Sequence, residues 1–471
     1  MNAMIGLAEV LCRLPLVFTV GYLARSVGAD IFGNWVLLLA FQVFVAGIAS
    51  LGLSSSLSRF VPASGVTDAA SYLRFAFSIC LVPVLIVGVL AYLFGMPVTQ
   101  FLGIKPELSW LLPLTTLMAA GSVADGFLDA YFKGRMAVGR QIAFITARTS
   151  IEIVAVVLVF VVTLPALDTA PQRLAGYICV VAACKAVIYP ALLIGLTKGH
   201  SFPSSNRRRA FLNYGLPMVP TVLAVWLVSQ SDRLVLSHFV AKADLGVYAF
   251  GASLATYVVF LGYAVYPLLL PGASRLHDDG DAAGVKALFH ESQRLFVLLW
   301  AGGMAFLALW SRDIIWWTGG DAFAAAAPVL LILSFAVGLD QLLGIYQYVF
   351  HLVKRTDLIL WLTLIYAAIM IGSLTFAGYA RGIAWAPWAV VAATAIYNAL
   401  RYRIAQRYLP IPMPDTILLK VGGIAVLTVL LSHYAADLGI GPRLVVSLVV
   451  LLPLAGLALR YLPDRSLDAV S

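Results

Sequence analysis

Long apolar stretches separated by short polar segments follow one another along the whole sequence. Many approach 20 residues, about the length that an α-helix needs to cross the ~30 Å hydrocarbon core of a bilayer. The pattern predicts fourteen transmembrane helices, at residues 5–24, 34–56, 73–95, 109–132, 142–164, 174–196, 214–240, 244–271, 293–311, 326–350, 357–379, 384–402, 417–435 and 441–461. The first stretch begins at Ile5 with no preceding Lys or Arg and no cleavage site, so we interpret it as a retained helix rather than a signal peptide.

The composition also indicates a membrane protein. Of the 471 residues, 62% are hydrophobic and 11% are charged, and the mean hydropathy is +0.96. A soluble domain of ordinary composition carries about 25% charged residues. The sequence therefore predicts an all-α polytopic membrane protein with no soluble domain large enough to fold alone.

The sequence contains no motif typical of a nucleotide, metal or redox cofactor site. No G-x-x-x-x-G-K-[ST] motif occurs, so we expect no P-loop ATPase within the chain. The cysteines lie in apolar segments and form no C-x-x-C pair; they are Cys12, Cys80, Cys179 and Cys184. We expect no disulfide, no metal site and no cofactor.

The Lys and Arg residues predict the orientation in the membrane. With a cytoplasmic N-terminus, the inside loops and tail carry 20 of these residues, from Arg59 to Arg465. The outside loops carry only seven: Arg25, Lys105, Arg173, Lys242, Arg312, Arg381 and Arg443. Because cytoplasmic loops carry the excess of positive charge, both termini are expected in the cytoplasm. The net charge of +9 then reflects topology, and we expect no nucleic-acid partner.

A polar segment at 197–213 divides the expected helices into six and eight. A similar turn follows the first helix of each part: Phe32-Gly33-Asn34-Trp35 and Leu245-Gly246-Val247-Tyr248. Six helices return the chain to its starting side, so a second copy would enter the membrane in the same orientation. Parallel repeats of this kind form two lobes around a central cavity in transporters.

The sequence resembles the bacterial polysaccharide flippases over roughly residues 5–410. Four segments carry the resemblance: Leu23-Ala24-Arg25-Ser26-Val27-Gly28 followed by Phe32-Gly33; Leu51-Gly52-Leu53 with Arg59; Tyr214-Gly215-Leu216-Pro217; and Ser231-Asp232-Arg233 followed by Leu245-Gly246-Val247-Tyr248. The similar proteins are the O-antigen and exopolysaccharide repeat-unit (Wzx-type) transporters of the multidrug/oligosaccharidyl-lipid/polysaccharide (MOP) exporter superfamily.

This resemblance implies a fold, an activity and partners. We expect two six-helix lobes, at 1–200 and 201–410, and an additional C-terminal helix pair at 411–471. The implied activity is movement of a polyprenyl-pyrophosphate-linked oligosaccharide from the inner to the outer leaflet of the bacterial inner membrane. The implied partners are this lipid-linked substrate, the bilayer, and, functionally, polysaccharide polymerase and glycosyltransferases.

Charged residues deep in a membrane normally face a partner or a water-filled cavity. At about 1.5 Å per residue, the deepest are Arg13, Arg148, Glu152, Lys185 and Asp340. We predict that the cations Arg13, Arg148 and Lys185 attract the substrate pyrophosphate, because guanidinium groups bind phosphate oxygens bidentately. Arg59 and Arg233 complete the predicted pyrophosphate-binding set.

The plainer interpretation of two of these residues is an intrahelical ion pair, since Glu9 and Arg13, like Arg148 and Glu152, are four residues apart. Lys185 has no acidic neighbour on its own helix and needs a partner from another one.

The buried acids offer a coupling step. Burial favours the neutral form of a carboxylate, so protonation of Asp125, Glu152 or Asp340 is expected to accompany a conformational switch. Asp340 has no cation nearby in its own helix, which makes it the first candidate for proton or sodium coupling in the second half. The alternative for Asp340 is a polar contact with a neighbouring helix.

Two other classes of function remain open. One is a drug/cation antiporter of the same superfamily, which should have an acid-dominated cavity. The other is a membrane-embedded polysaccharide polymerase or ligase, but every expected outer loop is short. Asp279-Gly280-Asp281 matches the D-x-D of some glycosyltransferases, yet no nucleotide-binding domain surrounds it, and a solvated loop explains it better. We therefore predict a transporter that is not an enzyme, and no catalytic residues.

Overall fold

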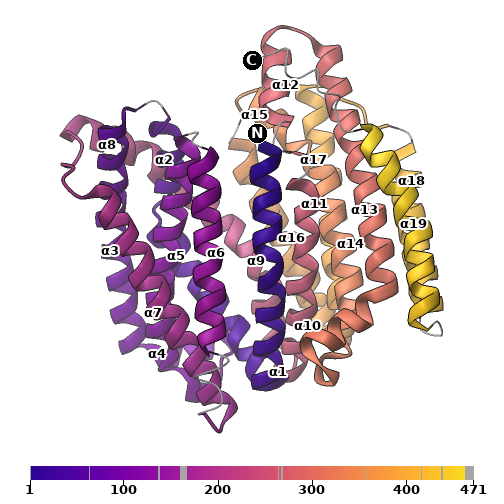
Figure 1. Ribbon diagram of the computed structural model, residues 1–471, viewed down its shortest axis with the longest axis horizontal. Coiled ribbons are helices and arrows are strands. Elements are labelled where there is room, and N and C mark those ends of the chain that lie inside the picture. The colour runs from indigo at the N-terminus through magenta and orange to yellow at the C-terminus, as the bar shows by residue number, and fades with distance from the viewer. Residues whose placement is uncertain are drawn as a thin grey trace. The chain divides into compact units, whose positions relative to one another are not determined.

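The computed structural model describes residues 2–62, 64–135, 138–159, 167–263, 265–266, 269–355, 357–414, 416–435 and 439–461, with the side chains of residues 2–17 and of a few others excepted. Within these residues every regular element is a helix. The α-helices of Figure 1 are α1 (Asn2–Ala49), α2 (Leu53–Phe60), α3 (Val66–Leu93), α4 (Gly95–Leu102), α5 (Leu111–Gly134), α6 (Val138–Leu158), α7 (Ala170–Thr197), α8 (Ser205–Gly215), α9 (Val219–Leu236), α10 (Lys242–Ala255), α11 (Val259–Tyr263), α12 (Leu269–Asp278), α13 (Ala282–Gly319), α14 (Ala326–Gly344), α15 (Gln347–Leu352), α16 (Asp357–Arg381), α17 (Ala386–Tyr408), α18 (Thr416–Ala435) and α19 (Ile440–Tyr461). Short 3₁₀ helices lie at Pro106–Leu108, Leu216–Met218, Thr256–Val258, Asp321–Phe323 and Gly382–Ala384.

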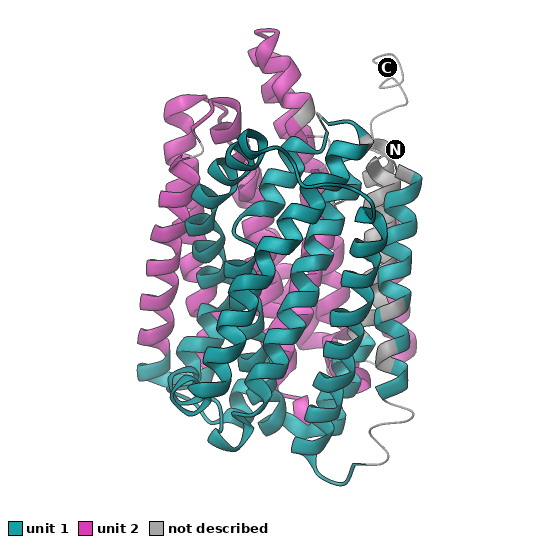
Figure 2. Ribbon diagram, turned by 90° about the vertical axis from the view of Figure 1, so that its left-hand side faces the viewer, with its two compact units in different colours: residues 1, 3–249, 378–383 teal, residues 2, 250–377, 384–471 magenta. Residues whose placement is uncertain are grey.

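The helices form two compact units, coloured separately in Figure 2. Unit 1 holds Ala3–Ala249 and Gly378–Ile383. Unit 2 holds Phe250–Ala377 and Ala384–Ser471. The predicted domain boundaries at residues 200 and 410 stay a prediction.

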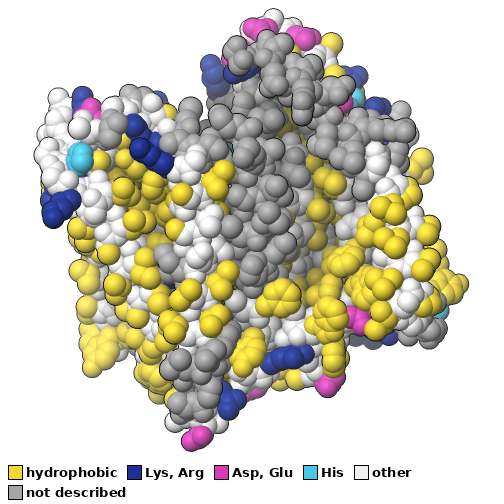
Figure 3. All heavy atoms as spheres, in the orientation of Figure 1, with side chains coloured by type: hydrophobic (Ala, Val, Ile, Leu, Met, Phe, Trp, Pro, Cys, Tyr) yellow, Lys and Arg dark blue, Asp and Glu magenta, His cyan; other side chains and the backbone are white. Residues whose placement is uncertain are grey.

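The outer faces of many helices expose large apolar side chains. On α3, Val82, Leu85, Ile86 and Val89 are each more than half exposed. On the face shown in Figure 3, hydrophobic side chains lie along the sides of the helices, and most visible charged groups lie toward the helix ends. Exposure of so much apolar surface to water would be unfavourable, whereas contact of the same surface with the hydrocarbon of a bilayer is not. The chain is a multi-pass membrane protein.

Ten described helices are long and apolar enough to cross a membrane, so the all-α polytopic class is confirmed while the count of fourteen is not. The first two expected spans run together in α1, where Phe18–Ala49 is one candidate. The expected spans at 142–164 and 384–402 correspond to α6 and α17, which are not among the ten, and both carry buried charged residues. The last expected span, 441–461, corresponds to a shorter apolar helix, Ile440–Leu454.

A kink explains how one helix joins the first two expected spans. Gly28 interrupts α1 with φ 75° and ψ 165°, a backbone conformation open to glycine and strained for other residues. The residues on both sides of Gly28 are helical, so the predicted break between the spans is reduced to a single residue.

The two segments that suggested an internal repeat are not turns in the structure, because they lie within helices α1 and α10, and they pack against each other in unit 1. A Cβ atom on Gly33 would stand 2.1 Å from the Lys242 carbonyl oxygen, and one on Gly246 would stand 2.0 Å from the Ala29 carbonyl oxygen. Such close backbone approach requires glycine at both positions. The segments around Gly52 and Gly215 also approach each other closely, because a Cβ on Gly52 would stand 2.2 Å from the Gly215 carbonyl oxygen.

Within unit 2, the long helix α13 carries the C-terminal pair α18 and α19 on one side and α14 on another. Arg443 of α19 pairs with Asp313 of α13, and its guanidinium lies 5.4 Å from the centre of the Trp310 ring. The Trp310 Nε1 donates to Ser447 Oγ at 2.9 Å. Helix α19 is therefore held against α13 by polar contacts as well as by helix packing.

Candidate functional site

A polar cavity of about 190 Å³ lies in unit 2, where one membrane span is interrupted. The span Ala326–Leu352 contains α14 and α15, separated by a turn at Ile345 and Tyr346. Backbone hydrogen bonds tighten there to the third preceding residue, from Tyr346 N to the Leu343 oxygen and from Tyr348 N to the Ile345 oxygen. Interrupted helices in membranes are tolerated where they are buried in protein or line a water-filled space.

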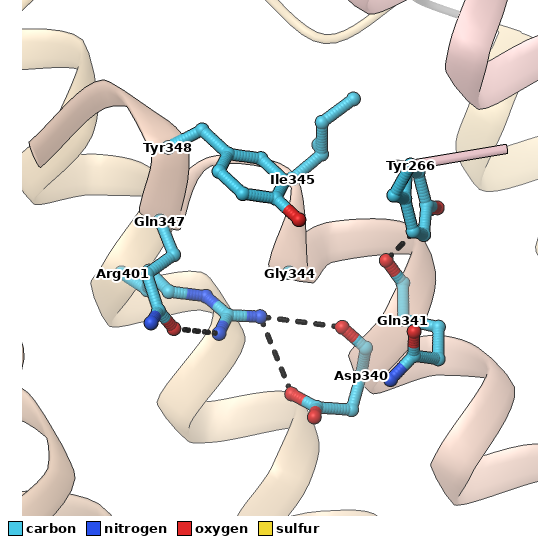
Figure 4. A pocket seen from close by; sticks show the side chains of 8 residues that line it. All are labelled: Tyr266, Asp340, Gln341, Gly344, Ile345, Gln347, Tyr348 and Arg401. Carbon is cyan, nitrogen blue, oxygen red and sulfur yellow. Dashed lines mark hydrogen bonds and ion pairs between the residues drawn. The ribbon is translucent and has the colours of Figure 1, made fainter. Parts of the chain in front are cut away.

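The cavity wall combines an acid, a cation and neutral polar groups. Its lining residues are Tyr266, Asp340, Gln341, Gly344, Ile345, Gln347, Tyr348 and Arg401 (Figure 4). Tyr266 donates its hydroxyl hydrogen to the Gln341 carbonyl oxygen at 3.0 Å. By its volume the cavity is large enough for several water molecules but too small for an oligosaccharide.

An ion pair crosses this cavity from α17 to α14. The Arg401 Nη2 lies 3.2 Å from Asp340 Oδ1 and also donates to the Asp340 backbone oxygen at 3.3 Å. The Arg401 side chain is 4% exposed, whereas that of Asp340 is 38% exposed. The cation is thus fixed inside the protein, and the carboxylate faces the open side of the pair.

Further contacts hold Arg401 in position. Its guanidinium lies 4.8 Å from the centre of the Tyr397 ring and donates to Gln347 Oε1 at 3.4 Å. It also hydrogen-bonds Asn398 Oδ1, while the Asn398 amide donates to Asp340 Oδ1 at 3.1 Å. The Arg401 Nε, however, is buried without a hydrogen-bond partner among the described residues. The guanidinium therefore retains capacity for an additional acceptor.

Unit 1 contains a second group of deep charges, on α5, α6 and α7. Arg148 Nη1 lies 3.6 Å from Asp125 Oδ1, and Lys185 Nζ lies 3.5 Å from Glu152 Oε1. All four side chains are mostly buried. Both distances exceed an ordinary charge-assisted hydrogen bond, and Asp125 Oδ1 is buried with no hydrogen-bond partner among the described residues.

Arg148 and Glu152, four residues apart on α6, do not form a salt bridge with each other in the structure. The salt bridges of Arg148 and Glu152 run to α5 and α7 rather than to each other. The intrahelical interpretation of this pair is therefore wrong, because the rotation of α6 turns the two side chains to different neighbours. Lys185 does find its expected partner on another helix.

The other predicted site residues have different surroundings. Arg13 and Glu9 lie in the stretch of α1 whose side chains are outside the described residues. Arg59 is exposed, and its guanidinium lies 4.4 Å from the centre of the Tyr214 ring. Arg233 donates to Gln230 Oε1 at 3.0 Å on its own helix.

Sequence reasoning missed Arg401, which it counted among the inside-loop cations. The structure buries it beside Asp340 instead. A signal was available, because Arg401 and Asn398 lie three residues apart near the end of the expected span 384–402, where a helix places both on one face. The Asp340 contact with a neighbouring helix was the alternative that the sequence had left open.

Metal and disulfide chemistry find no support among the described residues. No group of three or more His, Cys, Asp or Glu side chains there is placed to hold a metal ion. Cys80, Cys179 and Cys184 are free thiols, and Cys12 lies outside the described side chains.

The chain belongs to the polysaccharide biosynthesis protein family, whose model matches residues 3–276, more than half of the sequence. No curated protein matches the sequence significantly.

Solved structures of similar fold cover nearly the whole chain. A structure of the lipid II flippase MurJ in an inward closed conformation has a TM-score of 0.72 at 13% identity and covers 97% of this chain and 99% of its own. An inward-facing MATE family multidrug resistance transporter has a TM-score of 0.65 at 11% identity and covers 90% and 99%. A MOP superfamily transporter from Pyrococcus furiosus has a TM-score of 0.54 at 12% identity and covers 87% and 94%.

The predicted membership of the MOP superfamily is confirmed by the family match together with this shared fold. The identities are low, so the solved structures establish the fold and leave the substrate open. The protein is a lipid-linked flippase or another transporter of this superfamily.

Proposed function

We propose that this protein is a flippase for polyprenyl-pyrophosphate-linked oligosaccharides, the precursors of O-antigen or exopolysaccharide. The observation that carries the proposal is the match of residues 3–276 to the polysaccharide biosynthesis family. The fold shared with a lipid II flippase adds support, since that protein is also a flippase. Transport runs from the cytoplasmic to the periplasmic leaflet of the inner membrane, with both termini in the cytoplasm and with no catalytic step.

Deep cations and acids supply a way to couple binding to a conformational switch. Each of the three acids proposed for ion coupling pairs with one buried cation: Asp125 with Arg148, Glu152 with Lys185 and Asp340 with Arg401. When a proton neutralises the acid, or a cation such as Na⁺ binds it, the partner loses its counter-charge. The freed cation then binds a phosphate oxygen of the substrate.

We add Arg401 to the proposed pyrophosphate-binding set. Its Nε lacks a hydrogen-bond partner among the described residues, and Asp340 holds only the other end of the guanidinium. Arg148 and Lys185 act by the same exchange in unit 1, and Arg13, Arg59 and Arg233 remain proposed contacts. Polysaccharide polymerase and glycosyltransferases would consume the product and supply the substrate.

Translocation in proteoliposomes tests this proposal. A fluorescent polyprenyl-pyrophosphate oligosaccharide is reconstituted with wild type and with Arg148→Gln, Lys185→Gln or Arg401→Gln. Each substitution removes a charged hydrogen bond worth about 1.5–3 kcal/mol, so transport should fall roughly tenfold or more. The control is Arg355→Gln, which removes an equal charge from an exposed loop pair with Asp357.

The outcomes separate the function from its sites. Transport by wild type that survives in all three variants keeps the flippase and rejects the exchange of partners. A wild type that moves no lipid-linked sugar, but exchanges organic cations for protons, identifies a drug antiporter instead.

A further inference from the structure

An apolar groove with one basic end lies on the outer face of α3 in unit 1. Its volume is about 510 Å³, and its lining comprises Leu51, Phe75, Ser78, Ile79, Val82, Pro83, Ile86, Phe202 and Arg208. Most of the wall belongs to α3, while Phe202 and Arg208 come from the segment that leads into α8 and from α8 itself. None of its lining residues is among the charges proposed to handle the transported substrate.

The basic end is formed by two arginines that lie over aromatic rings. The Arg208 guanidinium lies 5.9 Å from the centre of the Phe75 ring, and that of Arg74 lies 5.2 Å from the centre of the Phe202 ring. Arg74 also donates to the His200 carbonyl oxygen. Because Phe75 and Phe202 both line the groove, these cation–π contacts place the two guanidinium groups beside it.

Arg208 differs from its neighbour Arg207 in lacking a counter-charge. Arg207 pairs with Asp68 at 2.7 Å. Arg208 has no ion pair among the described residues, and its Nε is buried there without a hydrogen-bond partner. A buried donor without an acceptor is costly, so the Arg208 guanidinium has capacity for an anionic oxygen from a bound molecule.

The remainder of the groove suits a hydrocarbon chain. Val82 and Ile86 are 57% and 55% exposed, and Ser78 is the one polar side chain on the α3 wall. From Phe75 to Ile86 the helix rises about 16 Å, which is about half the thickness of a bilayer core. A chain lying here thus spans one leaflet, and its headgroup reaches the two arginines.

We propose that this groove binds one anionic glycerophospholipid, such as phosphatidylglycerol, with its phosphate on Arg208 and Arg74 and an acyl chain along Val82, Pro83 and Ile86. The bound lipid ties α3 to α8 at the membrane surface that the charge distribution assigns to the cytoplasm. The proposal concerns a resident lipid and does not rest on the proposed transport function.

Native mass spectrometry of the delipidated full-length protein tests the site with phosphatidylglycerol as the probe. Arg208→Gln should weaken the first bound lipid about tenfold, the effect of losing a charge-assisted hydrogen bond. Arg209→Gln is the matched control, because it removes the same charge from the exposed adjacent residue of α8. Phosphatidylcholine, which has no net charge, should bind more weakly than phosphatidylglycerol to wild type.

A second variant tests the apolar part of the groove independently of Arg208. Val82→Trp fills the chain-binding surface and should also weaken the first bound phosphatidylglycerol while leaving the basic end unchanged. Equal losses in Arg208→Gln and Arg209→Gln would show diffuse charge attraction and overturn the proposal. Equal affinity for phosphatidylcholine, or displacement of phosphatidylglycerol by an equimolar polyprenyl phosphate, would also overturn it.

Discussion

The deep charged residues form ion pairs, and the two members of the pair in unit 2 differ strongly in burial. Arg401 is almost fully enclosed, whereas Asp340 keeps more than a third of its side-chain surface open. Placing a charge in low dielectric is costly unless a partner compensates it, so the enclosed member depends more on its partner. The pairs in unit 1 are more evenly buried, and their separations of 3.5–3.6 Å are longer.

This asymmetry predicts unequal effects of breaking the pair in unit 2. Asp340→Asn leaves Arg401 as an uncompensated buried charge and should destabilise the protein by about 3 kcal/mol. Arg401→Gln leaves a carboxylate that water in the cavity can solvate, so the loss of stability should be smaller. Thermal unfolding in detergent measures both, together with the double variant, which should recover part of the loss. Equal losses for the two single variants would contradict the argument.

At the scale of elements, close helix packing places the charges of unit 1. Helix α5 packs on α7 and α3, and α6 packs on α7. A Cβ on Gly121 of α5 would stand 2.5 Å from Lys185 Cβ and 2.6 Å from the Lys185 backbone carbon. The absence of a side chain at this position lets α7 approach closely enough to present Lys185 to Glu152.

Gly121→Ala should therefore force α5 and α7 apart and destabilise the protein by about 1–3 kcal/mol, the usual cost of overpacking. Gly126→Ala on the same helix is the control, because its Cβ would meet only Ser54 Oγ, at 3.9 Å. There the better helix propensity of alanine should leave stability unchanged or slightly raised. Unfolding temperatures compare the two, and a stable Gly121→Ala variant would show that the helices can adjust.

At the scale of the whole molecule, the sequence predicts the placement in the membrane through its loops. Cytoplasmic assignment of both termini gives 20 inside cations against seven outside, and the reverse assignment inverts this ratio. The ten candidate spans establish repeated crossing, but neither they nor the shared fold fix which end faces the cytoplasm.

Fusions to the C-terminus test the orientation directly. In a bacterial host, a green fluorescent protein fused after Ser471 should fluoresce, and alkaline phosphatase fused there should be inactive, because the former needs the cytoplasm and the latter the periplasm to fold. A phosphatase fused in the segment 103–110, an expected outer loop, should be active. The opposite pattern would reverse the topology and with it the proposed direction of transport.

Much of the architecture could be predicted because membrane helices are defined by local properties. Apolar length sets the spans, and the predicted all-α class and superfamily agree with the fold. The breaks were harder to predict. Gly28 turns the expected loop between two spans into a kink within α1, whereas the turn at Ile345 and Tyr346 interrupts a segment that reads as one continuous span.

The sequence by itself determined that this protein crosses the membrane repeatedly and carries charges deep within it, since both follow from hydropathy counted along the chain. Only the tertiary structure decided which charges meet. Arg148 pairs with Asp125 rather than with Glu152 four residues away. Arg401, which was expected among the cations of the inside loops, is buried and pairs with Asp340. The physical reason is that a partner depends on how each helix is rotated and how closely its neighbour packs, and spacing along one chain specifies neither.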